Sequence, residues 1–510
     1  MTSAREPQPA DGTPSPAFDA FVPTYAAGQP QVVAARIVAD LETPVSAMIK
    51  LAEGRPYSFL LESVSGGAVR GRYSMIGMKP DLVWRSHGAT VEINRHARTR
   101  PDAFEVDPTP PLASLRALLA ESRIELGSDL PPMAAGLFGY LGYDMVRHME
   151  RLPDANPDPL GIADAVMVRP TVVAVFDNIE DLVTIVTPVW PSSDVSAERA
   201  YDQACERLAD AVADFGRSIP RGAPPRARIR PDPVANMSQA DFEAMVEAAK
   251  RYIRAGDAFQ IVTAQRFELP FRLPPFSLYR SLRRLNPSPF LFFLDLDGFS
   301  LVGSSPEILV RLRDGAVTLR PLAGTRPRGR NAEADAALAA ELLADPKERA
   351  EHIMLLDLGR NDVGRVADVG TVRVTEKMVI EYYSHVMHIS SNVEGRLRPG
   401  LDAVDALVGG FPAGTVSGAP KVRAMEIIDE LEPVRRSFYA GAIGYFGADG
   451  SMDTCIGLRT GLVKDGTLYV QAGGGIVADS DPGLEYQESC NKAQALIRAA
   501  AHATGYAGRG

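Results

Sequence analysis

The runs TVVAVF (residues 171–176) and LVTIVTPV (residues 182–189) indicate the fold class most directly. Both are rich in β-branched residues, which suit the pleated surface of a sheet. Further apolar runs of strand length lie in the second half of the chain, at residues 290–296, 308–312 and 468–472. The sequence therefore predicts extensive β-sheet in both halves.

Two other stretches have the marks of helices. One extends from Ser196 to about Phe215. The other begins after Ser238, which can cap a helix whose third residue, Asp241, lies near the positive end of the helix dipole. The apolar residues of this second helix fall on one face: Phe242, Met245, Val246 and Ala249. The mixture of helices and strands predicts an α+β fold.

Length and composition exclude several classes of protein. The 510 residues, 45% hydrophobic and 23% charged, are typical of a soluble globular protein with more than one folding unit. The net charge of −10 gives no reason to bind nucleic acid. No apolar run approaches the ~18 residues of a membrane-spanning helix, and the N-terminal residues lack the apolar core of an export signal. We therefore expect a cytoplasmic protein that binds neither nucleic acid nor membrane.

Residues 217–233, RSIPRGAPPRARIRPDP, form the clearest candidate linker, because five prolines in this stretch exclude a regular helix. Its five arginines could also form a basic patch, although a solvated connector suits an acidic protein better. We expect a disordered leader at residues 1–17, an N-terminal region at 18–216, a linker at 217–235 and a C-terminal domain at 236–504.

Two pairs of glutamates are the most informative chemical pattern. Glu348 and Glu351 lie in DPKERAEHIMLLDLGRND, and Glu485 and Glu488 lie in GLEYQESCNK. On a helix, the spacing i, i+3 places both members of a pair on one face. Two such faces opposite each other suit Mg²⁺, which takes oxygen ligands from carboxylates, water and substrate. Acidic pairs are also common on solvated helix faces, so the spacing alone leaves that interpretation open.

Three further motifs have ordinary structural interpretations. His385 and His388, in SHVMHISSNVEG, are separated by apolar residues and suit a buried strand or a tight helix. The segment GTVSGAPK, at residues 414–421, lacks the residue order of a phosphate-binding loop. The run Gly473, Gly474 and Gly475 follows a strand-like stretch and is typical of a turn. None of them indicates a zinc or dinucleotide site.

The order and spacing of these motifs are similar to those of the chorismate-utilising enzyme family. Across residues 238–504 the matching segments are SSPEILV, PLAGTRPRG, AEHIMLLDLGRND, SHVMHISSNVEG, GTVSGAPK, YAGAIGY, CIGLRT and AGGGIVADSDPGLEYQE. In the first half, LLES, RYSMIG and GLFGYLGYD resemble the N-terminal region of the large subunits of anthranilate synthases and their relatives. The resemblance implies a layered α+β fold with large antiparallel sheets flanked by helices.

The resemblance also implies which residues form the site. Glu351 and Glu488 match the family's principal Mg²⁺ ligands, and Glu348 and Glu485 match the supporting carboxylates. Arg459 matches the arginine that binds the enolpyruvyl carboxylate of chorismate, where a guanidinium can form two charge-assisted hydrogen bonds. Other contacts to the substrate are implied for Gly324, Thr325, Thr415, Tyr439, Lys492, Gly473, Gly474 and Gly475, with Thr415 placed among the catalytic residues.

Two positions distinguish among the family's reactions. Members that add water carry a lysine base where this chain has Gln260, which cannot serve as that base. Aminodeoxychorismate synthases typically carry a lysine where this chain has Ala323. We therefore expect ammonia to add directly at C2 of the chorismate ring. Glu307 is the expected acid for the departing C4 hydroxyl, and His388 is the expected base that removes the C2 proton as pyruvate leaves.

The source of ammonia and the control of the enzyme follow from the same resemblance. No cysteine lies in the Gly-x-Cys-x-Gly elbow of a glutaminase, so a small glutamine amidotransferase subunit is the expected partner, in a heterodimer or a heterotetramer. Six residues match the family's tryptophan feedback site, although ordinary strand packing also explains the apolar ones: Leu61, Glu62, Ser63, Pro289, Phe290 and Leu291. Two alternatives stay open, an aminodeoxychorismate synthase and a catalytically silent tryptophan-binding subunit.

Overall fold

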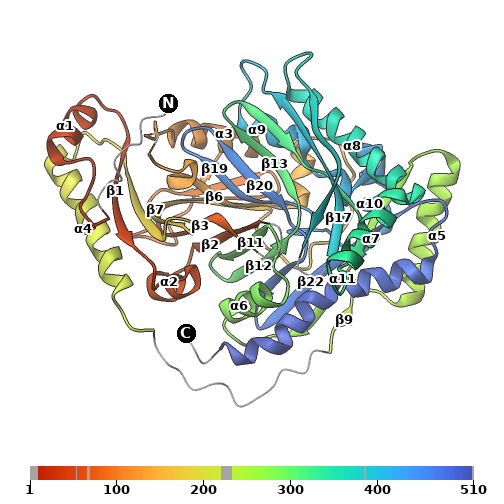
Figure 1. Cartoon of the computed structure of the whole chain (residues 1–510). Helices are drawn as coiled ribbons and strands as arrows, with labels where there is room; N and C mark the ends of the chain where they lie inside the picture. The colour runs from red at the N-terminus through yellow and green to blue at the C-terminus, as the bar shows by residue number, and fades with distance from the viewer. Residues whose placement is uncertain are drawn as a thin grey trace.

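The computed structural model of the chain describes residues 10–52, 54–65, 69–127, 129–219, 232–383 and 386–507. Most of the predicted linker, most of the predicted leader and His385 lie outside these residues. The described part is built around one network of antiparallel strands with helices on its outside (Figure 1). This arrangement confirms the α+β fold class.

The network is centred on two long strands that pair with each other, β3 (Val69–His87) and β7 (Ala165–Asp177). On one side β7 pairs with β8 (Leu182–Val189), which pairs with β1 (Gln31–Val38). Along another edge, β3 pairs with β4 (Thr90–Asn94), and β4 pairs with β5 (Glu105–Asp107). Both runs that indicated the fold class therefore lie at its centre, in β7 and β8.

Two series of strands lead away from this centre. The first follows β7 through β6 (Gly136–Leu141), β19 (Ala442–Gly447), β20 (Met452–Ile456), β13 (Ile308–Arg313), β14 (Ala316–Leu319) and β17 (Val386–Arg396), with β15 (Leu322–Pro327) and β16 (Arg373–Tyr382) also on β17. The second follows β3 through β2 (Ser58–Ser65), β11 (Phe290–Asp295), β12 (Phe299–Ser305), β21 (Thr460–Lys464), β22 (Thr467–Ile476) and β10 (Gln260–Pro270), with β9 (Val234–Ala235) and β18 (Gly418–Ala419) on β10. The pairs β6–β19 and β2–β11 join strands that precede the predicted linker to strands that follow it.

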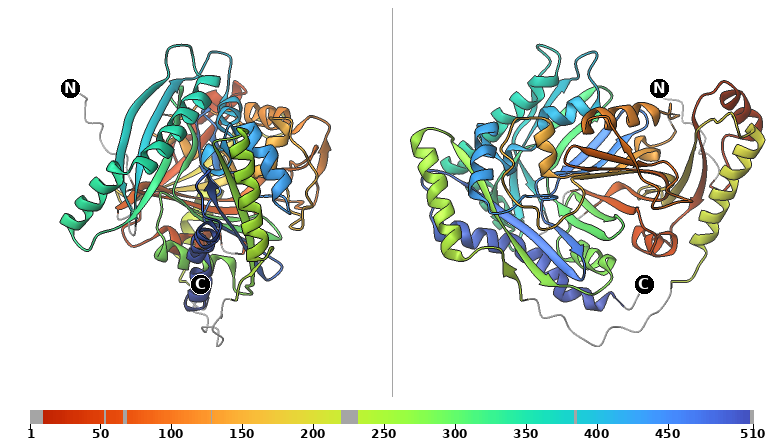
Figure 2. Two further views of the ribbon diagram at one scale, coloured as in Figure 1. Left: turned by 90° about the vertical axis from the view of Figure 1, so that its right-hand side faces the viewer. Right: turned by 180° about the vertical axis from the view of Figure 1, so that it is seen from behind.

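Three groups of helices cover the strands. Near β1 and β8 lie α1 (Phe18–Ala26), α2 (Pro44–Leu51) and α4 (Ala197–Phe215). Around β10 and β22 lie α5 (Gln239–Ala255), α6 (Pro275–Leu285), α10 (Lys421–Leu431) and α11 (Pro482–His502). Against β15 and β17 lie α7 (Ala332–Ala344) and α8 (Pro346–Val366), with α9 (Ala403–Gly410) on α8 and α3 (Pro111–Glu121) beside α9. Consecutive helices α4 and α5 lie at opposite ends of the molecule (Figure 2).

The two helices predicted from local signals form as expected. The Ser196 hydroxyl accepts a hydrogen bond from the backbone amide of Arg199 at the start of α4, at 3.3 Å. At the start of α5, Ser238 and Asp241 form a reciprocal capping box. All four predicted apolar residues of α5 are buried. None of the helices in the described part of the chain is both long and apolar enough to cross a membrane.

Candidate active site

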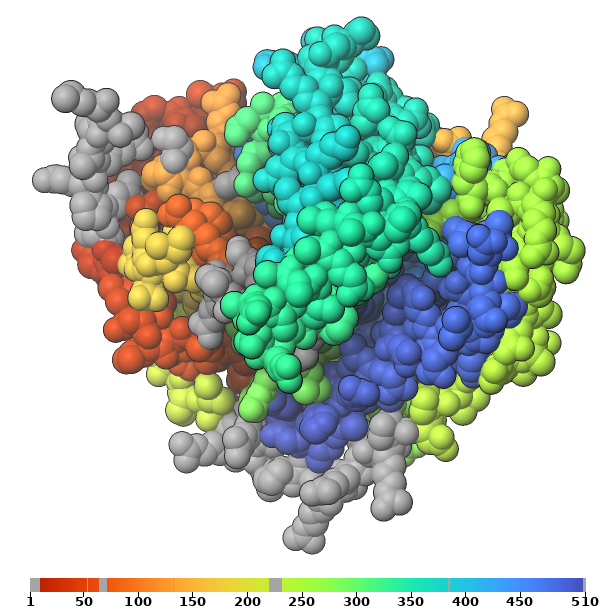
Figure 3. All heavy atoms as spheres, turned by 45° about the vertical axis from the view of Figure 1, so that its right-hand side comes forward, coloured from red at the N-terminus to blue at the C-terminus, as the bar shows by residue number. Residues whose placement is uncertain are grey.

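The two glutamate pairs lie on two helices, near the start of each. Glu348 is in the first turn of α8, whose N-cap Asp345 accepts hydrogen bonds from the amides of Lys347 and Glu348. Glu485 is in the first turn of α11, which Asp481 caps. Figure 3 shows α7 and α8 running beside α11 on one face of the molecule. Each pair thus has one member in a capped first turn and the other one turn further along its helix.

The four carboxylates influence one another electrostatically. Burial raises the pKa of Glu351, and the charges of Glu348 and Glu488 raise it further, while a hydrogen bond from Gln260 lowers it. That bond joins Gln260 Nε2 to Glu351 Oε1 at 3.1 Å. Burial also raises the pKa of Glu485, and the Glu488 charge adds to the effect. Clustered carboxylates that raise each other's pKa favour the binding of a cation.

Only two cations pair with these carboxylates among the described residues. Lys492 Nζ lies 2.7 Å from Glu488 Oε1 and donates to the Gly473 carbonyl oxygen at 2.9 Å. Arg326 Nη1 lies 3.0 Å from Glu348 Oε1. Among the described residues, no three His, Cys, Asp or Glu side chains lie close enough together to hold a metal ion. The four carboxylates outnumber the two cations, so this part of the site carries net negative charge.

The three glycines at 473–475 lie inside β22, so the predicted turn is wrong. They pair with β10, with Gly473 opposite Ala264 and Gly475 opposite Val262. A Cβ atom at Gly474 would lie 3.0 Å from Glu485 Oε2 and 3.6 Å from Glu488 Oε1. A Cβ at Gly473 would lie 2.0 Å from the Thr263 carbonyl oxygen, and a Cβ at Gly475 would lie 2.3 Å from Gln260 Nε2, so a close neighbour faces each of the three positions. The strand that pairs with these glycines, β10, lies far from them in the sequence.

A cavity of about 130 Å³ adjoins these glycines. It is lined by Thr415, Tyr439, Arg459, Lys492 and the three glycines, all of which the sequence analysis had assigned to the site, and also by Val262, Pro306, Val416, Leu458, Val470, Gln471 and Ala472. Within the described part of the chain, the Arg459 guanidinium has neither a hydrogen bond nor an ion pair, and its backbone φ is 48°. A partner-free cation on a strained backbone is suited to an anionic ligand.

His388 lies in β17 and is held in one tautomer. Its Nδ1 is 2.9 Å from the Gly324 carbonyl oxygen and 3.1 Å from the Thr325 hydroxyl, so Nδ1–H donates to the carbonyl. Burial lowers the pKa of His388 to about 4, and the charges of Arg459 and Lys492 also lower it. Nε2 is buried and has no hydrogen-bond partner in the described structure. At neutral pH this nitrogen is free to accept a proton.

The pKa of Glu307 shifts in the opposite direction from that of His388. It is buried, with 4% of its surface exposed. Burial raises its pKa to about 8, against hydrogen bonds from the Thr415 hydroxyl at 2.8 Å and the Leu322 amide at 3.4 Å. At neutral pH Glu307 is therefore protonated and able to donate a proton. Thr415 borders both a small cavity beside Glu307 and the cavity beside Arg459.

Comparison with known proteins places the sequence in a family. The model of the family described as chorismate binding enzyme matches residues 80–498. Anthranilate synthase component 1 of Cereibacter sphaeroides is 60% identical over 96% of this chain and 99% of its own length. The corresponding protein of Thermus thermophilus is 48% identical, over 91% of this chain and 96% of its own length.

The chain belongs to the chorismate-binding enzyme family. Its relatives place it among enzymes of the anthranilate synthase component 1 type. The solved structure of anthranilate synthase component I from Streptococcus pneumoniae has a TM-score of 0.73 and 36% identity, covering 91% of this chain and 99% of the other. A menaquinone-specific isochorismate synthase from Escherichia coli shares the fold, with a TM-score of 0.69 and 20% identity, over 95% of this chain and 98% of the other.

A second cavity in the protein has a volume of about 300 Å³. Most of the residues that the family resemblance assigns to tryptophan binding line it. Leu61, Glu62, Ser63, Phe290 and Leu291 line it, whereas Pro289 does not. The Glu62 carboxylate is already bound by Arg283, through Nη2 at 2.9 Å, and by the Tyr279 hydroxyl. The buried oxygen that lacks a hydrogen bond in this cavity is Asp453 Oδ1. No sequence motif marks Asp453.

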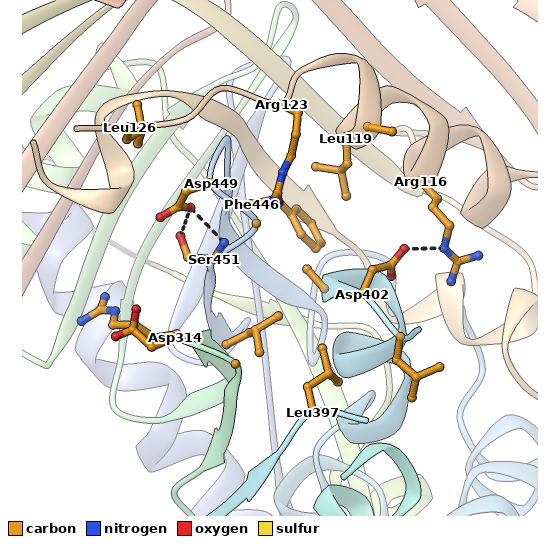
Figure 4. Close-up of a pocket in the computed structure, with 18 of the residues that line it drawn as sticks. Arg116, Leu119, Arg123, Leu126, Asp314, Leu397, Asp402, Phe446, Asp449 and Ser451 are labelled. Carbon is orange, nitrogen blue, oxygen red and sulfur yellow. Dashed lines mark hydrogen bonds and ion pairs between the residues drawn. The ribbon is translucent and has the colours of Figure 1, made fainter. Parts of the chain in front are cut away.

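The largest of the described cavities, of about 930 Å³, lies elsewhere, beside α3 and α9 (Figure 4). In it Arg116 Nε is 2.7 Å from an oxygen of Asp402, and Asp449 accepts hydrogen bonds from Ser451. None of the residues that line it belongs to the family's expected site. The candidate site is therefore assigned to the smaller cavity from its charges and hydrogen bonds, and not from its volume.

Proposed function

We propose that the chain converts chorismate and ammonia into anthranilate and pyruvate through 2-amino-2-deoxyisochorismate. The proposal rests on two groups whose pKa values shift in opposite directions. Glu307 is a protonated carboxyl whose partner Thr415 lines the cavity of about 130 Å³. His388 is a neutral imidazole whose Nε2 has no hydrogen-bond partner in the described structure. An enzyme that catalyses an elimination needs a proton donor and a proton acceptor at the same pH. Environments that raise the pKa of one group and lower the pKa of the other provide such a pair.

Glu307 donates its proton to the C4 hydroxyl as that group departs and ammonia adds at C2. His388 Nε2 then takes the C2 proton as pyruvate leaves, and the ring becomes aromatic. Arg459 binds the enolpyruvyl carboxylate, because its guanidinium borders the cavity without a protein partner. The backbone of Gly473, Gly474 and Gly475 lets the ring approach the strand closely.

We propose Mg²⁺ as the cofactor, held by Glu351 and Glu488, with Glu348 and Glu485 in support. The donors are all carboxylates, which is the chemistry that Mg²⁺ prefers. Burial raises the pKa values of Glu351 and Glu485, and neighbouring carboxylates add to the effect. The metal would offset the negative charge of the carboxylates and orient an anionic substrate, with water and substrate as its other ligands.

Ammonia, rather than water, is the proposed nucleophile. Gln260 stands where a base would be required to activate water, and its side-chain amide donates to Glu351. An amide is not basic at neutral pH, so this position serves the carboxylate cluster instead of activating water. The absence of a lysine at Ala323 likewise disfavours the aminodeoxychorismate synthase alternative.

We propose that ammonia reaches the site from a small glutamine amidotransferase subunit, in a heterodimer or heterotetramer. Support comes from the relatives' description as component 1 of a synthase. Copurification after coexpression, with glutamine-dependent activity in the complex alone, is the expected result. Coexpressed subunits that elute separately would contradict this part of the proposal.

We also propose that free tryptophan inhibits the enzyme from the cavity that Leu61 and Ser63 line. Arg283 binds Glu62, and Arg311 binds Oδ2 of Asp453 at 3.0 Å. Asp453 Oδ1 has no hydrogen-bond partner, so we propose this oxygen as the partner of the ligand's amino group. An ammonium group there would supply the hydrogen bond that the buried oxygen lacks.

A mass-resolved assay tests the proposed reaction. Purified chain is incubated with chorismate, Mg²⁺ and a high concentration of ammonium, with and without tryptophan. Anthranilate and pyruvate in equal amounts, suppressed by tryptophan, are the expected result. Aminodeoxychorismate without pyruvate would support the aminodeoxychorismate synthase alternative, and tryptophan binding without turnover would support a regulatory subunit.

A further inference from the structure

Arg436 lies in the segment EPVRRSFYAG, which no motif assigned to the site, yet its guanidinium is buried beside the candidate active site. Only 2% of its surface is exposed. It forms a two-pronged ion pair with Glu432, through Nε to Oε2 at 3.0 Å and Nη2 to Oε1 at 2.6 Å. Glu432 is itself fixed, because its Oε1 accepts a hydrogen bond from the backbone amide of Ala264 at 2.9 Å.

The same guanidinium also binds two backbone carbonyls. Nη1 donates to the Val416 oxygen, and Nη2 donates to the Val262 oxygen, each at 2.6 Å. Val262 belongs to β10 and Val416 to the short 3-10 helix Gly414–Val416. One planar group therefore joins the carboxylate of Glu432 to two separate backbone segments.

A guanidinium is required at this point because a strand pairing ends there. Strand β18 has two residues, which pair with Gln260 and Ile261 of β10. Beyond them, the Val262 amide still donates to the Ser417 carbonyl at 3.0 Å, but the Val262 carbonyl no longer meets a neighbouring strand on that side. Arg436 supplies the missing donor, and its fork geometry reaches a carboxylate and two carbonyls at once, which a lysine ammonium cannot do in the same arrangement.

Both backbone segments border the cavity beside Arg459. Val262 and Val416 line it, and Thr415, the neighbour of Val416, donates to Glu307. The Tyr439 ring, which also lines the cavity, has its centroid 5.6 Å from the guanidinium carbon. Arg436 thus contacts three of the surfaces that shape the cavity without lining it itself.

Residues from before the predicted linker secure the same turn. The centroid of the Tyr143 ring lies 4.9 Å from the guanidinium carbon of Arg436. The Tyr143 amide donates to the Ser437 carbonyl at 2.7 Å, and Asp144 Oδ2 accepts from the Ser437 amide at 2.8 Å. The GYD sequence at 142–144 therefore holds the segment that carries Arg436.

We propose that Arg436, fixed by Glu432, is a positioning residue that keeps Thr415 in hydrogen-bond contact with Glu307 during turnover. The inference rests on the proposed function, because it assigns Glu307 the role of acid. Its competing explanation is that the Arg436–Glu432 pair serves stability alone.

The matched control is Arg169. Its guanidinium also makes a two-pronged ion pair, with Asp81 at 2.9 Å for both bonds, lies over the Trp190 ring at 4.1 Å, and is 9% exposed. It lines none of the cavities near Glu307 or Arg459. Arg169→Lys therefore removes a similar fork from a similar environment away from the chemistry.

In the ammonium assay, Arg436→Lys is expected to lower kcat by about 10- to 100-fold with a smaller change in the chorismate KM, because a displaced hydrogen bond acts on the chemical step. Arg169→Lys is expected to keep the wild-type kcat. Both variants are assayed below their measured Tm, so that unfolding does not contribute. Equal kcat values for the two variants would overturn the proposal.

A double-mutant cycle with Thr415→Val adds the second measurement. If Arg436 acts through Thr415, the double variant loses little more kcat than Thr415→Val alone. Independent, multiplying losses would show that Arg436 acts by another route and would refute the positioning role. Wild-type kcat in Thr415→Val would overturn both the site assignment and this inference, whereas an impaired Thr415→Val beside an active Arg436→Lys would overturn the inference alone.

Discussion

Replacing Glu307 by glutamine should stabilise the protein at alkaline pH while it removes activity. The pKa of Glu307 is raised by burial from 4.5 to about 8. At about 1.4 kcal/mol for each pKa unit, ionising this group in the folded state costs about 5 kcal/mol relative to the unfolded chain. Glutamine keeps the shape and an acceptor for the Thr415 hydroxyl but has no charge to bury.

The sign of the pH dependence follows from the direction of the pKa shift. Because the folded protein holds the Glu307 proton more tightly than the unfolded chain, the stability contributed by this proton is complete below about pH 4.5. It is lost as the pH rises from there through about 8. The wild-type free energy of unfolding should therefore fall over this interval by several kcal/mol more than that of Glu307→Gln.

Urea unfolding of both proteins, at a series of pH values across this interval, measures the difference. The matched control is Asp295→Asn, which removes a partly buried carboxyl whose pKa burial raises to about 6 and which lines neither cavity of the candidate site. This control should change the pH dependence of stability and retain turnover. Glu307→Gln should lose about 10² to 10⁴ in kcat. Parallel stability curves for wild type and Glu307→Gln would refute the reasoning, since they would mean that Glu307 is ionised at no cost.

Three more predictions concern the other parts of the site. His388→Ala should impair elimination more than amination, so the amino intermediate should accumulate in mass-resolved assays, and its absence would count against His388 as the base. Glu351→Gln should raise the Mg²⁺ concentration needed for half-maximal activity, whereas Glu394→Gln, a carboxylate on β17 outside the cluster, should not; equal Mg²⁺ dependence in both would exclude the proposed ligand. Ser63→Phe should relieve inhibition by tryptophan because the new ring fills the cavity that Ser63 lines; unchanged sensitivity would show that tryptophan binds elsewhere.

Local signals allowed much of the fold to be predicted. The caps at Ser196 and Ser238 involve contacts three residues apart, so the sequence contains all the information they need. The i, i+3 spacing of the glutamates predicts a shared helix face only where each pair lies on a helix, and α8 and α11 are those helices. A common site for the two pairs was expected from the family resemblance alone, because no local pattern says which helices face each other.

The errors and omissions involve contacts between distant residues. Gly473–Gly475 forms a strand only because residues more than 200 positions earlier, in β10, pair with it. Arg283 neutralises Glu62 across a separation of 221 residues, so the carboxylate expected to bind an amino group is already occupied. No motif spacing marks Arg436 or Asp453. Arg436 is identified by the hydrogen bonds of its buried guanidinium, and Asp453 by the missing hydrogen bond at its buried Oδ1.

The pairing of β6 with β19 and of β2 with β11 has a practical consequence for anyone who wishes to express part of this chain. A fragment that starts after the predicted linker would lack β2, which pairs with one side of β11, and β6, which pairs with one side of β19. The backbone donors and acceptors on those sides of β11 and β19 would then form open edges. Such edges recruit strands from other molecules. Truncation at the apparent boundary should therefore yield aggregates rather than a smaller chorismate-binding enzyme, and the two fragments should regain solubility only when they are produced together.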